Sequence, residues 1–209
     1  MIGVRKYVEG DREAIQEICY LTGYMGDSAE RFWRHKESFV EMWTSYYIDQ
    51  EPESVYVATI DEAVVGYLTG CMDTSLATLS IHAQIIKYGL LFRPGTAGFL
   101  WRGIIDSIRD KQVARAALMD ERWPAHLHIN LLPAARGSGL GRALMERWLT
   151  QLKNSGSPGC HLSTLVENTG AVSFFERVGF NPFGEPALIQ GMRGPGGERL
   201  HQQIMVWSA

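Results

Sequence analysis

The sequence has few cysteines, no long apolar run and no excess of positive charge. Its three cysteines, Cys19, Cys71 and Cys160, are odd in number and widely spaced, which excludes a disulfide framework and a CxxC zinc site. No apolar run approaches the roughly 20 residues that a membrane helix requires, and the charged segment 9–13 makes the N-terminus unlike a signal peptide. The net charge of −3 gives no basic surface for nucleic acid. We therefore expect reduced thiols in a cytoplasmic protein with neither a membrane nor a nucleic-acid partner.

What the sequence does have is the composition of one globular domain. A hydrophobic content of 45% in 209 residues is enough for one core, so we expect a single domain over residues 1–209. Its periodicity predicts an α/β (α+β) order of elements. The expected strands cover 2–8, 55–60, 64–72, 125–132, 160–166, 180–183 and 201–207. The expected helices cover 11–22, 29–49, 139–153 and 168–177, and a mostly helical insertion covers 74–120 with a break at 93–95.

The clearest functional signal is a glycine-rich turn between a strand and a helix. The strand at 125–132 leads into Arg136-Gly137-Ser138-Gly139-Leu140-Gly141-Arg142, where the next helix begins. Glycines permit a tight turn and a close approach of the backbone to a ligand. Unpaired amides in the first helical turn, the helix dipole and the neighbouring arginines suit a pyrophosphate.

Two common phosphate-binding motifs do not fit this turn. A P-loop needs GxxxxGK[S/T], which the chain lacks. A Rossmann fingerprint needs GxGxxG, but Arg142 occupies the position of its third glycine, which disfavours a nicotinamide-dependent oxidoreductase. The form [Q/R]xxGx[G/A] does fit, with Arg136, Gly139 and Gly141. Taken alone, this motif leaves open a tight turn without a ligand.

The turn resembles the coenzyme-A motif of the GNAT N-acetyltransferases. A second segment, Glu167 to Phe180, resembles the second motif of that family, with Asn168, Ala171 and the run Phe175-Glu176-Arg177-Val178-Gly179-Phe180. The resemblance implies the GNAT fold, with a mixed, mostly antiparallel sheet of six or seven strands flanked by helices. It also implies acetyl-CoA as co-substrate, and it would make a homodimer unsurprising; no metal is expected, because no third ligand is spaced to join His126 and His128. The coenzyme site that it implies comprises Leu131, Leu132, Arg136, Gly137, Ser138, Gly139, Leu140, Gly141, Arg142, Asn168, Ser173 and Phe175.

The N-terminal half carries a narrower resemblance. Residues 18–23, Gly26-Asp27, the aromatic segment after them and Glu51-Pro52-Glu53 are similar to the acetyltransferase-like domain attached to some O-GlcNAcases. That branch includes degenerate domains, so the resemblance implies the fold while it weakens the interpretation as an enzyme. The alternative function is a catalytically degenerate pseudo-acetyltransferase that acts as a binding module.

Direct attack of an amine on the thioester requires a base, because an amine with a pKa near ~10.4 is mostly protonated at neutral pH. Alternation places His126, His128 and Asn130 on one face of their strand. Imidazoles with a pKa near ~6.5 can relay protons, and the Ala-His-Leu-His run resembles the paired-histidine strand of arylalkylamine N-acetyltransferases. Both histidines could instead pack structurally, whereas a metal role lacks a third spaced ligand. Asp73 is either a second base or a solvated acid at the end of its strand.

Two further features concern the thioester and the acceptor. The resemblance implies that backbone amides near Leu131 and Leu132 polarise the thioester carbonyl. Phe175 stands where the family usually has a tyrosine that protonates the leaving thiolate. The candidates to replace that tyrosine are Tyr24, Tyr46, Tyr47 and Tyr88.

The acceptor is expected to be an amine, either of a small molecule or of a protein lysine or N-terminus. The regions 24–47 and 191–197 flank the acceptor side in GNAT folds, and their aromatic residues suggest an apolar or cationic group held by ring faces. A core helix and a mobile hairpin are the alternative interpretation of these two regions.

Overall fold

One seven-stranded sheet runs through the chain in the order β1-β2-β3-β4-β5-β7-β6. The computed structural model describes residues 1–77, 81–110 and 118–209. Every neighbouring pair of strands is antiparallel except β4 and β5, which are parallel, and this arrangement confirms the predicted fold class. The strands are β1 (Ile2–Lys6), β2 (Val55–Ile60), β3 (Ala63–Cys71), β4 (Ala125–Leu131), β5 (Gly159–Leu165), β6 (Asn181–Arg193) and β7 (Arg199–Ser208).

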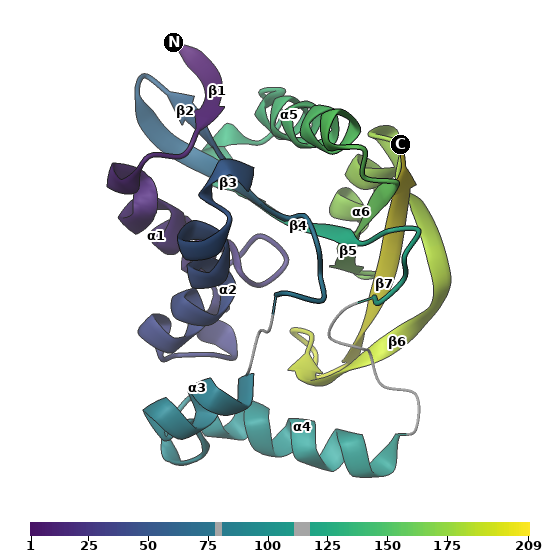
Figure 1. Ribbon diagram of the computed structural model, residues 1–209. Helices are drawn as coiled ribbons and strands as arrows, with labels where there is room; N and C mark the ends of the chain where they lie inside the picture. The colour runs from purple at the N-terminus through teal and green to yellow at the C-terminus, as the bar shows by residue number, and fades with distance from the viewer. Residues whose placement is uncertain (78–80, 111–117) are drawn as a thin grey trace.

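Helices cover both faces of the sheet (Figure 1). The helices α1 (Arg12–Thr22) and α2 (Lys36–Gln50) pack on one face, in what we call the first core, and α5 (Leu140–Ser155) and α6 (Thr169–Arg177) pack on the other, the second core. Successive side chains of a strand point to opposite faces. On β3, Tyr67 therefore belongs to the first core and Leu68 to the second.

The three cysteines lie in these cores, each buried and unpaired. Burial raises the pKa of each of their thiols to about 12, because a thiolate would lose its hydration there.

Two expected elements differ from the structure by more than two residues at one end. The helix expected over 29–49 begins only at Lys36, because Ala29–Arg31 form a separate 3-10 turn and the His35 side chain accepts a hydrogen bond from Ser38 N at the start of α2. The strand expected over 180–183 extends to Arg193, so residues 191–193 of the glycine-rich segment 191–197 belong to β6. The tight turn that remains, at 194–197, joins β6 to β7.

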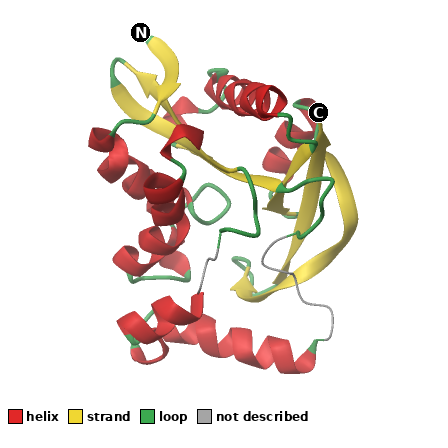
Figure 2. Cartoon of the chain, in the orientation of Figure 1, coloured by secondary structure: helices red, strands yellow, loops and turns green. Residues whose placement is uncertain are grey.

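The insertion between β3 and β4 is mostly helical over its described residues, with α3 (Ile81–Tyr88) and α4 (Ala97–Arg109) on either side of the expected break (Figure 2). Residues 78–80 and 111–117 of the insertion lie outside the described residues. Asp106 fastens α4 to β6, since its carboxylate accepts from Gly191 N and Arg193 Nη1, each at 2.9 Å. Arg193 holds the pKa of Asp106 well below its usual range. Gly191 is required at this contact, because a Cβ there would lie 2.4 Å from the carbonyl oxygen of Phe99.

Candidate active site

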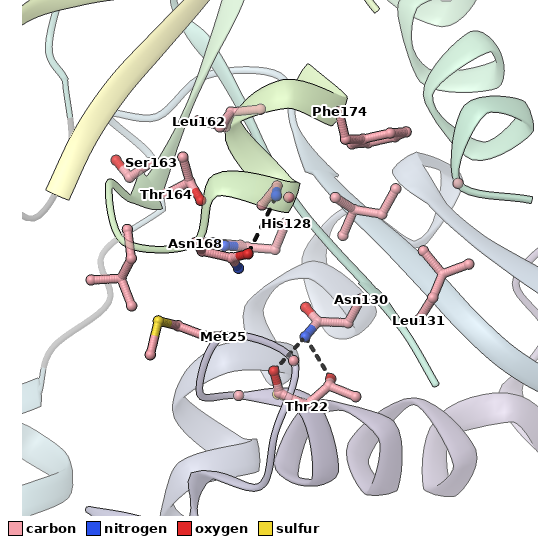
Figure 3. Close-up of a pocket in the computed structure, with 18 of the residues that line it drawn as sticks. Thr22, Met25, His128, Asn130, Leu131, Leu162, Ser163, Thr164, Asn168 and Phe174 are labelled. Carbon is pink, nitrogen blue, oxygen red and sulfur yellow. Dashed lines mark hydrogen bonds between the residues drawn. The ribbon is translucent and has the colours of Figure 1, made fainter. Parts of the chain in front are cut away.

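The strands β4 and β5 pair only at their beginnings. Their register covers two pairs, Ala125 with Cys160 and His126 with His161. Beyond that point β4 stays paired with β3 and β5 with β7, so the two strands diverge and a gap opens in the middle of the sheet. A cavity of about 900 Å³ lies at the gap and is lined by residues of both strands, including His128 and Thr164 (Figure 3).

Backbone groups of β4 face this gap. The amide of Leu132 donates to the Val65 carbonyl oxygen at 2.9 Å, which is on the β3 side. Because backbone groups alternate in direction along an antiparallel strand, the amides of Ile129 and Leu131 point the other way, toward the gap. The carbonyl oxygen of Leu131 accepts from Arg136 on that side, at 3.4 Å. The structure therefore leaves the Leu131 amide, and not the Leu132 amide, free to meet a ligand.

The glycine-rich turn brings a helix N-terminus to one end of the cavity. Gly137 and Gly139 have φ values of 77° and 85°, which favour glycine, and α5 begins immediately afterwards. The first amide to bond within that turn is Ala143 N, which donates to Gly139 O at 3.0 Å. The amides of Gly141 and Arg142 precede it and have no carbonyl to bond within the helix. The turn therefore offers an electropositive backbone surface to the cavity.

Most residues of the predicted coenzyme site line the cavity, and four do not. Ser138 shapes the turn, since its hydroxyl donates to Ala135 O at 2.6 Å. Leu140 is buried in the second core, Leu132 packs against the first core, and Ser173 lies on α6 away from the cavity. The predicted residues that do line it are Leu131, Arg136, Gly137, Gly139, Gly141, Arg142, Asn168 and Phe175.

The second predicted motif forms a wall of the cavity. Asn168 begins α6, and its side-chain oxygen accepts from Ala171 N at 3.3 Å (Figure 3). Phe175 is buried, and its ring packs between those of Phe174 and Phe180. This wall supplies apolar surface and one amide side chain, but no acidic hydroxyl.

One chain of hydrogen bonds joins both predicted histidines. The Thr74 hydroxyl donates to Pro124 O (2.7 Å), so its oxygen accepts from His126 Nδ1 (2.8 Å). Neutral His126 then accepts at Nε2 from the Tyr47 hydroxyl (2.7 Å). The Tyr47 oxygen in turn accepts from His128 Nε2 (2.9 Å). We therefore assign an unprotonated Nδ1 to His128, and this nitrogen has no hydrogen-bond partner within the described parts of the chain.

Both histidines are neutral at pH 7. Burial lowers the pKa of His128 to about 4, with His161 adding to the effect. Burial also lowers the pKa of His126 well below its ordinary value, again helped by the neighbouring imidazoles. The ring of His161 lies 5.7 Å from that of His126 and donates from Nδ1 to Trp123 O at 2.9 Å. The cluster thus keeps an imidazole with a free lone pair at the cavity wall.

The other candidate base, Asp73, lies elsewhere. Its carboxylate accepts from the amide and the hydroxyl of Ser75 at 2.9 and 2.7 Å, and it does not line the cavity. These hydrogen bonds lower the pKa of Asp73, so the carboxylate is ionised at the surface. The geometry favours the histidines over Asp73.

Tyr67 lines the cavity, although the sequence patterns did not single it out. Tyr67 lies beside Asn130 in the β3–β4 register and donates to its side-chain oxygen at 3.3 Å. The alternation of side chains along β3 could have indicated its direction, because Tyr67 points to the same face of the sheet as Cys71, the face of the first core. None of the four tyrosines considered from the sequence, Tyr24, Tyr46, Tyr47 and Tyr88, lines the cavity.

The cavity continues through the gap to the α1–α2 face of the sheet. Aromatic and thioether side chains line it there, and Phe99 of α4 is among them, so the insertion forms part of the wall. The loop 23–28 also lines this side and is held at two points. Tyr24 donates to Arg193 O at 2.8 Å, and Arg136 donates to Gly26 O at 2.7 Å.

The profile of the acetyltransferase (GNAT) family matches residues 23–180 of the chain. Among solved structures, the protein described as SsHAT is 27% identical, with 99% of this chain and 98% of that chain covered and a TM-score of 0.67. The ribosomal-protein-S18-alanine N-acetyltransferase from Escherichia coli is 16% identical, with 100% and 94% covered and a TM-score of 0.57. The yncA protein from Salmonella typhimurium, solved with its cofactor acetyl-CoA, is 15% identical, with 99% and 93% covered and a TM-score of 0.60.

None of the helices described here has the length and apolar character needed to cross a bilayer. Within residues 1–77, 81–110 and 118–209, no three His, Cys, Asp or Glu side chains are arranged to share a metal ion.

Proposed function

We propose, because the chain belongs to the acetyltransferase (GNAT) family, that its cavity binds acetyl-CoA and that the acetyl group passes directly to an amine in a ternary complex. Membership of this family makes the protein an acyl-CoA N-acyltransferase. The observation that carries the proposal is the gap between β4 and β5. It joins the phosphate-binding turn on one face of the sheet to a histidine and an apolar compartment on the other.

Different residues around the gap would bind different parts of acetyl-CoA. The turn from Arg136 to Arg142 would hold the pyrophosphate with its backbone amides and two guanidinium groups. The free backbone edge of β4 and the side chain of Asn168 would hold the amide-containing arm. Phe174 and Phe175 would cover that arm and exclude water. Acetyl-CoA supplies an activated acyl group with a thiol as leaving group.

The chemistry then depends on two groups of β4. His128 Nδ1 would accept a proton from the acceptor ammonium, after which the amine nitrogen bonds to the acetyl carbon and the carbon–sulfur bond breaks. The second proton, which the nitrogen carries in excess once it has bonded to the carbon, would pass to the departing thiolate. The Leu131 amide would donate to the carbonyl oxygen as charge develops on it. With Phe175 in place of a tyrosine, the sulfur would leave as thiolate, which a thiol pKa near ~8.5 permits.

The chain of hydrogen bonds behind His128 gives the proton a route away from the cavity. A proton that arrives at His128 Nδ1 can be matched by release from Nε2 to Tyr47, and from Tyr47 to His126. A histidine with a pKa of about 4 holds a proton weakly, so it suits a relay better than a store. In this proposal His128 contacts the substrate, and Tyr47 and His126 act through it.

The test is a calorimetric titration with acetyl-CoA of the wild type and of two matched variants. Arg142→Gln removes a guanidinium that lines the cavity. Arg147→Gln makes the same charge change on an exposed part of the same helix, five residues further from its N-terminus. We expect Arg142→Gln to weaken binding about tenfold, the loss of one charge-assisted phosphate contact, and Arg147→Gln to weaken it less than about threefold. Absence of binding to the wild type would refute the proposal.

A degenerate binding module is the second candidate function. Phe175 favours it, because a buried phenylalanine cannot donate a proton to the thiolate, and the N-terminal resemblance to O-GlcNAcase-associated domains is consistent with it. Release of free coenzyme A in the presence of an amine separates the two candidates. Amine-dependent release supports the transferase, and tight acetyl-CoA binding without release from any class of amine supports the binding module.

A further inference from the structure

The acceptor side of the cavity is built from aromatic rings and thioethers. Its lining on the α1–α2 face includes Phe32, Phe39, Met42, Trp43, Phe99 and Met192. The rings contact one another, with centroid separations of 5.2 Å between Phe32 and Phe99 and 6.0 Å between Phe32 and Phe39. The ring of Trp43 lies edge-on to that of His128 at 5.4 Å. A ligand that reaches His128 from this side is therefore surrounded by apolar and π surfaces.

This compartment offers no carboxylate to a cation. No Asp or Glu occurs among the residues of the described chain that line the cavity, and its guanidinium groups, Arg136, Arg142 and Arg177, belong to the turn and α6. An ammonium group would meet ring faces and the lone pair of His128 Nδ1, which can accept its proton. Further charges on a polyamine, an aminoglycoside or a lysine-rich peptide would be buried without a partner, and such burial is costly.

The walls of the compartment are also tied to one another. The loop 23–28 is tied to β6 by Tyr24 and to the phosphate-binding turn by Arg136. Phe99 approaches from α4, which Asp106 fastens to β6 and β7 through two arginines and the amide of Gly191. Segments far apart in the sequence therefore fix the walls on several sides of the amine, and this suits a small molecule better than a polypeptide chain.

We propose that the acceptor is a small primary amine carried on an aromatic or similarly apolar body, and that Phe99, supplied by the insertion, selects for that body. The proposal rests on the proposed transferase function and specifies its substrate class. The amine nitrogen meets His128, while the apolar body packs against Phe99, Phe32 and Met192. Hydrophobic contact then supplies the binding energy that carboxylates supply to polycationic substrates elsewhere.

The first test compares acceptors by the rate of coenzyme A release. The probes are 2-phenylethylamine, n-propylamine, spermidine and a lysine-containing peptide. We expect kcat/KM for 2-phenylethylamine to exceed that for n-propylamine at least about tenfold and that for spermidine at least about a hundredfold. A preference for spermidine or the peptide would overturn the substrate class and leave the transferase function standing.

The second test assigns the selectivity to Phe99. We expect Phe99→Ala to lower the ratio of kcat/KM for 2-phenylethylamine to that for n-propylamine about tenfold. The matched control, Trp101→Ala, removes a larger ring from the same helix. Trp101 is 50% exposed and outside the cavity, so in Trp101→Ala the ratio of the two kcat/KM values should stay within about twofold of the wild-type ratio. Because the ratio is taken within one protein, partial unfolding does not affect it, and an equal change in both variants would refute the role of Phe99.

A binding measurement separates this proposal from the function on which it rests. Calorimetry on the wild type saturated with coenzyme A should detect 2-phenylethylamine and should detect spermidine at least about tenfold more weakly. If 2-phenylethylamine binds more tightly than spermidine but no amine is acetylated, the transferase proposal fails and the acceptor site stands. If neither amine binds, or spermidine binds more tightly, the acceptor site proposed here is wrong.

Discussion

Tyr47 tests the proton relay, because its hydroxyl connects the two histidines. Its oxygen lies 2.7 Å from His126 Nε2 and 2.9 Å from His128 Nε2, and its side chain has no exposed surface. The substitution Tyr47→Phe removes this hydroxyl and keeps the ring, which lies edge-on to both imidazoles. It leaves His126 Nε2 without a donor and the Nε2 proton of His128 without an acceptor.

The expected cost follows from those two unpaired atoms. A buried polar group that loses its partner costs about 1–3 kcal/mol, so the free energy of unfolding of Tyr47→Phe should fall by about 2–4 kcal/mol. The turnover number should fall about 10- to 100-fold, within the usual contribution of general-base catalysis, because His128 keeps its free nitrogen but loses the outlet for the proton. The Kd for acetyl-CoA should stay unchanged, because Tyr47 does not line the cavity.

Tyr20→Phe is the matched control. Tyr20 is buried in the same core, but within the described residues its hydroxyl donates to the carbonyl oxygens of Trp33 and Arg34, at 3.1 and 3.3 Å, and to no imidazole. Urea unfolding should give a loss of about 1 kcal/mol for this variant, and coenzyme A release should give a kcat within about twofold of the wild type. If kcat falls equally in the two variants, or if Tyr47→Phe keeps its kcat within about twofold, the relay is refuted.

Two further predictions concern acidic pH and the loop that closes the cavity. The pKa of His128 is about 4 in the folded protein and ~6.5 in the unfolded chain, so the stability that this group contributes is fully present above pH 6.5 and is lost as the pH falls toward 4. Unfolding in urea should therefore show about 2 kcal/mol less stability at pH 5 than at pH 7.5 from this group. The loss should be smaller in His128→Gln, and equal losses in the variant and the wild type would contradict burial of His128 as the cause. Gly26→Ala places a Cβ 2.5 Å from Arg136 Nη2 at a φ of +89°, so we expect about 1–2 kcal/mol less stability. Gly10→Ala, with no atom within 4 Å of the new Cβ, should be almost neutral in the same assay, and similar losses in the two would argue against a tied loop.

The strand, turn and helix at the glycine-rich end of the cavity could be predicted because their signals are local. The glycines at 137 and 139 have the positive φ that their residue type suggests, and α5 follows directly. The alternation of β4 correctly placed His126 and His128 on one face. Patterns of this kind involve residues a few positions apart, where propensity and periodicity act.

The rest depends on contacts that periodicity does not encode. Tyr47 meets His126 across 79 positions of sequence, and Tyr24 meets Arg193 across 169. The aromatic segment before α2 reads as helix by composition, but Trp33 donates instead to Ser38 Oγ at 2.9 Å and packs against the insertion. The extension of β6 to Arg193 is likewise set by Asp106 of α4. Tertiary contacts override local preference at each of these places.

The position of the proposed base follows from where the sheet opens. His126 belongs to the last pair that joins β4 to β5, and His128 is the next residue on the same face, the first beyond the pairing. Because side chains alternate along a strand, the rings of His128 and His126 lie on one face of β4, and Tyr47 can bridge them from α2.

The relay then leads away from the gap to Thr74, which lies where the insertion begins. The same insertion supplies Phe99 to the acceptor compartment. It therefore contacts the far end of the proposed relay and the body of the proposed amine, although it contributes neither the glycine-rich turn nor the proposed base. Changes within the insertion should consequently alter the choice of acceptor and the rate of proton removal before they alter the affinity for acetyl-CoA.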